Sequence, residues 1–229
     1  MNTTYPLASV GELIGESSRA AILVCLLDGR ARTAGELAFT ANISAQSASA
    51  HLSKLVDGGL LALQSSGRHR YFSLAGPEVA LALEALGTIA TKAPRGNTHP
   101  PRSRDEIREL RSCYDHLAGR IAVELARTLE ERRIIQGNGK RDYELGREGQ
   151  RWFGKFGIDV GRVRHSRRCF ARKCIDWTER RPHLAGALGA ALYSRLLSLG
   201  WIARRRETRA VRITAEGLRE LRVQFGLTL

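Results

Sequence analysis

The chain has 229 residues, of which 43% are hydrophobic and 26% are charged, proportions that are typical of globular proteins. No stretch approaches the ~20 apolar residues that a membrane-spanning helix needs. The first residues also lack the basic segment and apolar core of a secretory signal. We therefore expect a cytoplasmic protein with no membrane partner, whose four cysteines are reduced thiols.

The net charge of +14 is concentrated in the second half of the chain. Residues 1–100 carry 8 Lys and Arg against 7 Asp and Glu, whereas residues 101–229 carry 29 against 16. A basic field of this size attracts polyanions, among which DNA is the commonest partner. The alternative is a basic surface that is only solvated.

A proline-rich segment divides the chain into two parts. Residues 93–104 contain three of the six prolines and show no apolar periodicity, which is typical of a linker. We expect a DNA-binding and dimerisation domain at 1–92 and a second domain at 105–229.

The first part begins with two predicted helices. Ser17 or Ser18 is placed to cap a helix that Gly29 ends near residue 28. Thr33 then starts a short second helix, with Glu36 three residues later as in a capping box.

A third helix and a hairpin follow. After a turn at 39–43, Ser44 caps a helix over 45–57, in which apolar residues recur at helical spacing. Strands at 60–64 and 69–74 flank a polar tip, which predicts a hairpin. Pro77 then begins a helix that is apolar almost all round and should be buried against a partner.

This order of elements is that of a winged helix-turn-helix, and the residues resemble the ArsR/SmtB family of repressors over about 75 positions. The resemblance lies in LVCLLDGRARTAGELA and in NISAQSASAHLSKLVDGGLLALQSSGRHRYFSLAG. In that family the S-x-S-x-H-L-x-x-L string lies on the recognition helix, and the G-R-x-x-Y string, here Gly67, Arg68 and Tyr71, marks the wing. The resemblance implies a mainly α fold with short β-hairpin wings (α+β) that binds double-stranded DNA.

The predicted DNA contacts lie on the third helix and on the hairpin tip. A recognition helix presents its polar side chains to base edges, and basic residues of a wing contact phosphates or the minor groove. The candidates are Ser44, Gln46, Ser47, Ser49, His51, Lys54, Arg68, His69 and Arg70. For single residues the alternative is that His51 packs at the helix base and that the serines only cap the helix.

We expect a homodimer, because one winged helix reads only a half-site. The helix that begins at Pro77 should pair with the first helix or with its copy in the partner.

The metal sites usual in this family have no counterpart here. Their thiolate cluster lies on the helix before the recognition helix, where this chain has ELAFTAN, without Cys or His. Their other site needs Asp and His on the helix after the wing, and PEVALALEALGTIA has neither. The resemblance therefore does not make this chain a metal sensor, and we expect no cofactor, although a metal outside the usual family sites stays possible.

The second part contains an internal repeat. The string His116-Leu-Ala-Gly recurs 67 residues later from His183, and further leucines and isoleucines match at the same offset. Gly149 matches Gly217 at an offset of 68. Self-similarity of this kind indicates duplication. We expect two winged-helix-like repeats that face each other across a pseudo-twofold axis and form a ligand cleft.

Each repeat contributes a Cys, an Asp and a His, which marks a candidate effector site. The candidates are Cys113, Tyr114, Asp115, His116, Cys174, Asp176, Trp177, Arg180, Arg181 and His183. Aromatic walls from Tyr114, Trp152, Trp177 and Trp201, with two arginines, favour an organic or anionic effector. A metal, metalloid or thiol-redox switch at Cys113, Cys169 and Cys174 is the second interpretation, and structural packing is the third.

The sequence thus predicts a sequence-specific transcriptional regulator, a repressor that an unknown small molecule controls through the second domain. One alternative is an architectural nucleic-acid binder with little sequence preference. The other is a catalyst built on the Cys, Asp and His sets. Because the chain has no phosphate-binding glycine loop, HExxH or nucleophile elbow, we do not expect an enzyme.

Overall fold

A computed structural model describes residues 7–66, 69–90, 101–139, 141–205 and 208–227. The chain divides into two compact units, Met1–Leu83 and Glu84–Leu229, and the division falls inside helix α5 (Pro77–Ala90). Residues 93–100 of the expected linker lie outside the described residues. Residues 101–104 begin helix α6 (Pro101–Glu109), where proline suits the first helical position. In the described part of the chain, no helix is long and apolar enough to cross a membrane.

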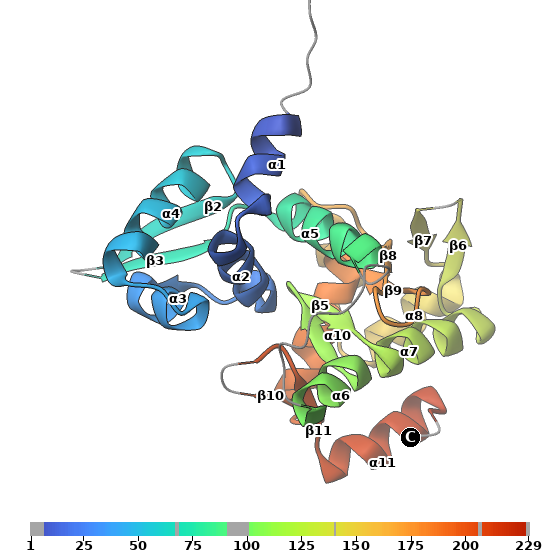
Figure 1. Ribbon diagram of the computed structural model, residues 1–229. Coiled ribbons are helices and arrows are strands. Elements are labelled where there is room, and N and C mark those ends of the chain that lie inside the picture. Colours follow the sequence, from blue (N-terminus) through green and yellow to red (C-terminus); the bar gives the residue numbers. More distant parts are fainter. Residues whose placement is uncertain (1–6, 67–68, 91–100, 140, 206–207, 228–229) are drawn as a thin grey trace, which may run out of the picture. The chain divides into compact units, whose positions relative to one another are not determined.

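The first unit is a winged helix-turn-helix, as predicted, in which a three-stranded antiparallel sheet has the order β1-β3-β2 (Figure 1). Before α5 its described elements are α1 (Leu7–Gly15), α2 (Ser17–Cys25), β1 (Arg32–Thr33), α3 (Ala34–Ala41), α4 (Ala45–Asp57), β2 (Leu61–Ser66) and β3 (His69–Leu74).

Local hydrogen bonds define the helix ends of this unit. The predicted capping box of Thr33 and Glu36 is present at α3, and Gly29 ends a 3-10 turn with φ 75°. The predicted cap of α2 by Ser17 or Ser18 is wrong. Glu16 caps this helix instead, because its carboxylate accepts from the N–H groups of Ser18 and Arg19. These two bonds lower the pKa of Glu16 to about 2.

Strand β1 was not expected, and a buried ion pair leads into it. Asp28 and Arg32 contact each other at 2.6 Å, with 4% and 12% of their side chains exposed. Arg32 also donates to the carbonyl of Cys25. The pair therefore fixes the turn between α2 and the sheet, and α3 starts directly after it.

In the second unit, the described elements after α6 begin with β4 (Arg111–Cys113), β5 (His116–Ala118), α7 (Arg120–Glu131), β6 (Gln136–Asn138), β7 (Asp142–Glu144), α8 (Arg147–Lys155) and α9 (Val160–Arg164). They continue with β8 (Arg172–Ile175), β9 (Pro182–Ala185), α10 (Gly186–Ser198), β10 (Ile202–Arg204), β11 (Val211–Ile213) and α11 (Ala215–Phe225). Strands β6-β7-β8-β9 form one antiparallel sheet, while β4-β5 and β10-β11 are hairpins.

The order hairpin, helix, strand pair, helix occurs at β4 to α8 and again at β8 to α11. Helix α7 packs against β9, α10 packs against β5, and β5 lies beside β9. In the repeated string His-Leu-Ala-Gly, the first three residues lie in strands β5 and β9, and a helix follows directly in both places. The duplication itself remains a prediction.

The repeated glycines have a steric reason. Gly119 and Gly186 have φ of 96° and 78°, which side chains rarely adopt. A Cβ on Gly119 would lie 2.8 Å from the carbonyl oxygen of Arg108, and a Cβ on Gly186 would lie 2.7 Å from that of Cys169. The chain therefore passes from strand to helix with another segment close against it.

Trp201 is buried in the hydrophobic core of this unit, and the partly buried Trp152 packs against that core. Trp152 stacks on Phe156 with ring centroids 5.2 Å apart, and Trp201 meets the same ring edge-on at 5.6 Å. Phe225 from α11 completes this aromatic group. Both tryptophans thus stabilise the fold. Their packing with Phe156 and Phe225 explains why they are aromatic, so their presence does not indicate a ligand site.

Gly217→Ala should lower the free energy of unfolding by about 1–3 kcal/mol or more, through overpacking. Gly217 lies in the first turn of α11, and a Cβ there would lie 1.9 Å from the carbonyl oxygen of Trp201. Gly154→Ala in α8 is the matched control, since nothing lies within 4 Å of its added Cβ, and it should stabilise the chain by about 0.5–1 kcal/mol. Urea denaturation measures both, and equal effects would contradict the packing described here.

Candidate DNA interface and buried cysteine–histidine cluster

Helix α4 presents polar side chains to solvent. Ser44 caps it as predicted, since its Oγ accepts from the N–H of Ser47 at 3.1 Å. The apolar side chains Ala48, Leu52 and Leu55 are buried. The exposed predicted contacts are Gln46, Ser47, Ser49 and Lys54. The helix therefore has the two faces that a recognition helix needs.

His51 lies at the edge of this surface. Its ring is half-buried, and Nδ1 lies 3.3 Å from Nη1 of Arg19 and 3.5 Å from Oε2 of Glu16. These contacts link α4 to the start of α2. They support packing at the helix base, and contact of His51 with DNA remains a prediction.

The wing is the β2-β3 hairpin. Its register pairs Ser66 with His69, and the predicted contact Arg68 lies outside the described residues. His69 and Arg70 are exposed. The guanidinium of Arg70 lies 5.8 Å from the centre of the Phe72 ring. This cation–π contact orients the Arg70 side chain and leaves its positive charge in place.

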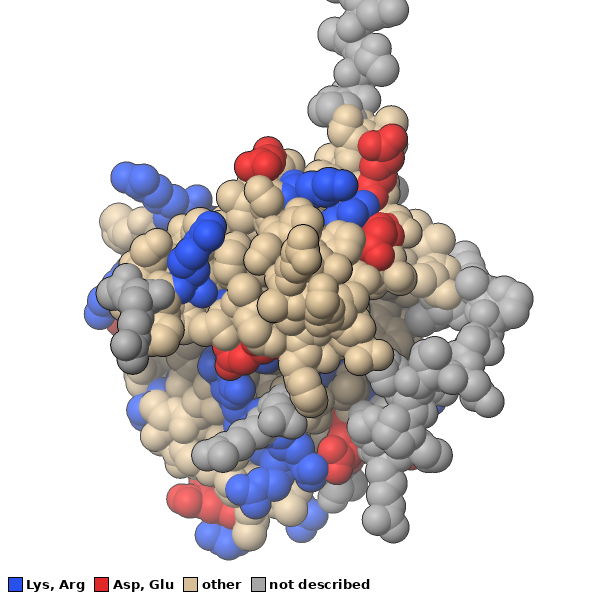
Figure 2. All heavy atoms as spheres, turned by 60° about the vertical axis from the view of Figure 1, so that its left-hand side comes forward, with Lys and Arg blue, Asp and Glu red and all other residues tan. Residues whose placement is uncertain are grey.

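Basic and acidic side chains mix on the molecular surface. Figure 2 shows Lys and Arg side chains spread over the visible face, with Asp and Glu side chains between them. The positive charge of the chain therefore does not form one uniform patch on that face.

In the second unit, four predicted residues come together in the interior. The ligand atoms of Cys113, His116, Cys174 and His183 all lie within 4.8 Å of one another, and all four residues are buried. Two of these atoms, the Nε2 atoms of His116 and His183, are 3.2 Å apart.

Cross-strand pairing explains how these residues meet. Cys113 on β4 pairs with His116 on β5, and Cys174 on β8 pairs with His183 on β9. The first hairpin turns within two residues, where Tyr114 has a φ of 60°, and the second has a longer turn. The different spacing of Cys and His in the sequence is therefore a difference in turn length, and the register is the same.

An aspartate stands beside each histidine. Nδ1 of His116 lies 3.3 Å from Oδ1 of Asp115, and Nδ1 of His183 lies 3.6 Å from Oδ2 of Asp176. Each carboxylate has an arginine partner that the sequence did not predict for it. Arg168 contacts Asp115, and Arg111 contacts Asp176.

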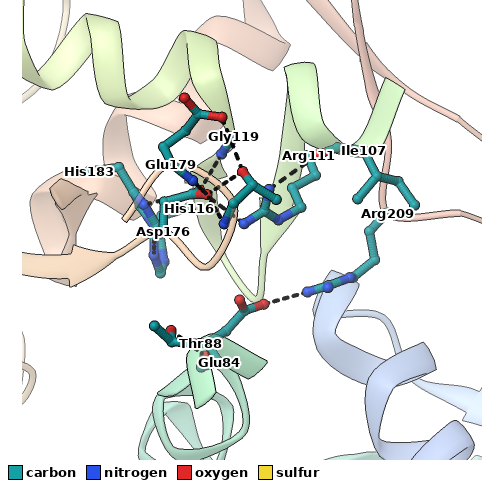
Figure 3. Close-up of polar contacts among 11 residues, drawn as sticks. Glu84, Thr88, Ile107, Arg111, His116, Gly119, Asp176, Glu179, His183 and Arg209 are labelled. Atoms are coloured by element: carbon teal, nitrogen blue, oxygen red, sulfur yellow. Dashed lines mark hydrogen bonds and ion pairs between the residues drawn. The ribbon is translucent and has the colours of Figure 1, made fainter. Parts of the chain in front are cut away.

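Asp176 has the larger network of the two (Figure 3). It accepts from Arg111 Nη2 at 2.9 Å and from the N–H of Gly119 at 2.6 Å. Thr178 and Glu179 donate to its second oxygen. Burial alone would raise the pKa of Asp176, but Arg111 and the bonds from Thr178 and Gly119 hold that pKa well below its usual range.

The remaining predicted effector residues lie around the turn after β8. The ring of Trp177 packs on the guanidinium of Arg111, with 4.7 Å between the Arg111 Cζ atom and the ring centre. Arg180 and Arg181 are exposed, and their backbones close the turn on Asp176. Cys169 is exposed and contacts Asp142, so the structure leaves it outside the cluster that holds Cys113 and Cys174.

Protonation in the cluster follows from its burial. A hydrogen bond with Cys174, together with burial, raises the pKa of the Cys113 thiol well above its usual range. Burial and the neighbouring His116 lower the pKa of His183 well below its usual range. Burial also disfavours the charged form of His116, but the neighbouring Cys113 and Asp115 raise the pKa of His116 to about 9. Without a metal ion, this environment therefore favours a neutral Cys113 thiol, a neutral His183 and a protonated His116.

A small apolar cavity lies among α7, α10, β5 and β9, between the two series of elements for which we expected a ligand cleft. Its volume is about 10 Å³, and its lining includes Leu117, Ala122, Leu184 and Tyr193. That space holds about one water molecule, whereas pockets that bind drug-sized ligands measure about 300–1,000 Å³. This cavity therefore does not fit an organic effector.

Comparison with known proteins connects the chain to DNA-binding regulators. A family model described as "Helix-turn-helix domain" matches residues 14–64. The HTH-type transcriptional regulator YdfF of Bacillus subtilis (strain 168) is 43% identical over 211 residues, which are 92% of this chain and 93% of that protein.

Among solved structures, a winged helix-turn-helix DNA-binding domain, Mb0332 of Mycobacterium bovis, is 27% identical and has a TM-score of 0.36. The matched region covers 42% of this chain and 87% of the Mycobacterium bovis chain. The cadmium metal-sensor CMTR of Mycobacterium tuberculosis is 31% identical and has a TM-score of 0.32. This match covers 41% of this chain and 94% of the CMTR chain.

Asp176→Asn should lower the free energy of unfolding by about 3–5 kcal/mol, because it leaves Arg111 buried without its counter-charge. Both side chains of this pair are 0% exposed. Glu148→Gln is the control, since it breaks the exposed pair with Arg151 and should cost less than about 1 kcal/mol. Denaturation followed by tryptophan fluorescence compares them, and a cost of less than 1 kcal/mol for Asp176→Asn would contradict the role of this pair.

Proposed function

Since the chain belongs to the HTH-type transcriptional regulators, we propose that it is a sequence-specific repressor that binds operator DNA through α4 and the β2-β3 wing. The observation that carries this proposal is the arrangement of α4. Gln46, Ser47 and Ser49 stand exposed near its N-terminal end, while its opposite face is buried in the unit. An α-helix of this kind fits the major groove.

The proposed contacts have distinct tasks. The amide of Gln46 suits bidentate reading of adenine, and Lys54 suits a phosphate or guanine. Arg70, with Arg68 and His69, would contact the DNA backbone beside the groove. A role as repressor is supported by the resemblance of these segments to the ArsR/SmtB repressors.

The second unit is proposed as the regulatory one. Its two series of elements bring matching Cys, His and Asp residues together at β4-β5 and β8-β9, and we infer that they arose by duplication. Gly149 and Gly217 support this inference, because an added Cβ on each would lie 2.0 or 1.9 Å from a carbonyl oxygen, of Ile134 and Trp201 respectively.

A homodimer would place two α4 helices on two half-sites, about one DNA turn apart. Helix α5 supports this proposal, since Leu86 is 44% exposed and Ile89 is 67% exposed. Apolar side chains that lie one turn apart on a helix suit a partner surface.

Gln46→Ala should weaken binding to a selected operator by about 1–3 kcal/mol and relax its specificity at one position. Arg70→Ala should weaken operator and random duplexes about equally and reduce the salt slope by about one unit. Fluorescence anisotropy with the full chain measures both, on a duplex selected from a random library.

Arg151→Ala on α8 is the matched control, because it removes the same charge from an exposed side chain that is 69% accessible. It should leave operator affinity unchanged. If it weakens binding as much as Arg70→Ala does, and if Gln46→Ala has no effect, the chain is an architectural binder that uses its basic second unit.

Ile89→Asp should convert the dimer to a monomer, because it places a charge on the apolar face of α5. Val223→Asp on α11 is the control, since this side chain is 74% exposed but lies outside the proposed interface. Light scattering at micromolar concentration should give twice the 25.3 kDa of one chain for the unmodified protein and for the control. A monomeric unmodified protein would refute the proposal.

A further inference from the structure

We propose that Cys113, His116, Cys174 and His183 together hold one zinc-class divalent metal ion, which clamps hairpins β4-β5 and β8-β9. The site lies in the second unit, and its four residues stand on other elements than the helices that carry metal ligands in the ArsR/SmtB repressors. The inference does not depend on the proposed function, because ion binding and DNA binding are measured separately.

The ligand set is the first support. Two thiolates and two imidazoles are a common set for tetrahedral zinc, with bonds of about 2.3 Å to sulfur and 2.0–2.1 Å to nitrogen. Such bonds separate two nitrogen ligands by about 3.3 Å and two sulfur ligands by about 3.8 Å. The two Nε2 atoms here are 3.2 Å apart, and all four ligand atoms lie within 4.8 Å of one another.

The orientation of the two rings is the second support. Asp115 faces Nδ1 of His116, and Asp176 faces Nδ1 of His183. In the neutral His116 ring, the carboxylate of Asp115, 3.3 Å from Nδ1, favours the tautomer with its proton on that atom and a lone pair on Nε2. At His183, Oδ2 of Asp176 lies 3.6 Å from Nδ1, which has no hydrogen-bond partner among the described residues, and its Nε2 faces that of His116. Two lone pairs at 3.2 Å repel each other unless a cation or a proton lies between them.

Charge balance is the third support. A divalent ion bound by two thiolates and two neutral imidazoles carries no net charge, since two protons leave the cysteines when the ion binds. A neutral complex suits an interior in which these residues are only 1–5% exposed.

The geometry also indicates what the ion does. Four protein ligands complete a tetrahedron and leave no open position for substrate, which is the pattern of structural zinc sites. One Cys and one His come from each hairpin. Ion binding therefore joins the two halves of the second unit and contributes to its folding free energy.

The test uses the full chain, purified with a tag that contains no histidine and without chelator. Elemental analysis and native mass spectrometry should find one Zn²⁺ per chain. Replacement by Co²⁺ should give the visible bands of a tetrahedral site and a thiolate charge-transfer band. Removal of Zn²⁺ should lower the melting temperature, and added Zn²⁺ should restore it.

Variants assign the ligands. Cys113→Ser and Cys174→Ser should each lower Zn²⁺ affinity at least about 100-fold, and Asp115→Asn should lower it about 10–100-fold by weakening the support of His116. Cys169→Ser is the matched control, since this exposed thiol lies outside the cluster, and it should keep the ion.

If the ligand variants do not fold, alkylation of the unmodified protein replaces them. Cys113 and Cys174 should resist iodoacetamide until a chelator removes the ion, and peptide mass spectrometry identifies them. Three results would overturn the proposal: no thiolate band with Co²⁺ and no thermal shift with Zn²⁺, a disulfide between Cys113 and Cys174 in the fresh protein, or loss of the ion in Cys169→Ser.

Discussion

The second unit depends on one buried ion pair, between Arg111 on β4 and Asp176 after β8. Neither side chain is exposed. An uncompensated charge at this depth would cost several kcal/mol, so the two residues must stay together. The same carboxylate accepts from the N–H of Gly119 at the start of α7 and faces His183 on β9. It thereby joins the turn after β8 to β4 and to the start of α7, beside the Cys and His cluster.

The repeated string His-Leu-Ala-Gly has a physical reason at each position. Its histidine points into the cluster, its leucine and alanine are buried in the core, and its glycine adopts a positive φ where another carbonyl lies too close for a side chain. Asp115 and Asp176 differ in depth, since 25% of the Asp115 side chain is exposed. The two halves thus share a register but not an environment, and Asp176 has the larger structural role.

Sequence reasoning succeeds here where the determinants are local. Thr33 with Glu36, Ser44 and Pro77 mark helix starts through bonds and torsions within a few residues, and the structure has those helices. The same reasoning brought Cys113, His116, Cys174 and His183 to one site by matching the repeats. It missed Arg111 and Arg168 as partners of the aspartates, because both contacts join residues more than 50 positions apart. It also favoured an organic effector because of the aromatic residues, but two of these, Trp152 and Trp201, pack against Phe156 in the fold.

The helix-turn-helix and the buried cluster lie in different units, so each can be tested by itself. The central claim for the second unit is that two thiolates and two imidazoles from two hairpins surround one ion. X-ray absorption at the zinc edge of the full-length protein tests it most directly. The account predicts two sulfur neighbours at about 2.3 Å and two nitrogen neighbours at about 2.0–2.1 Å. A shell of oxygen and nitrogen without sulfur would contradict it.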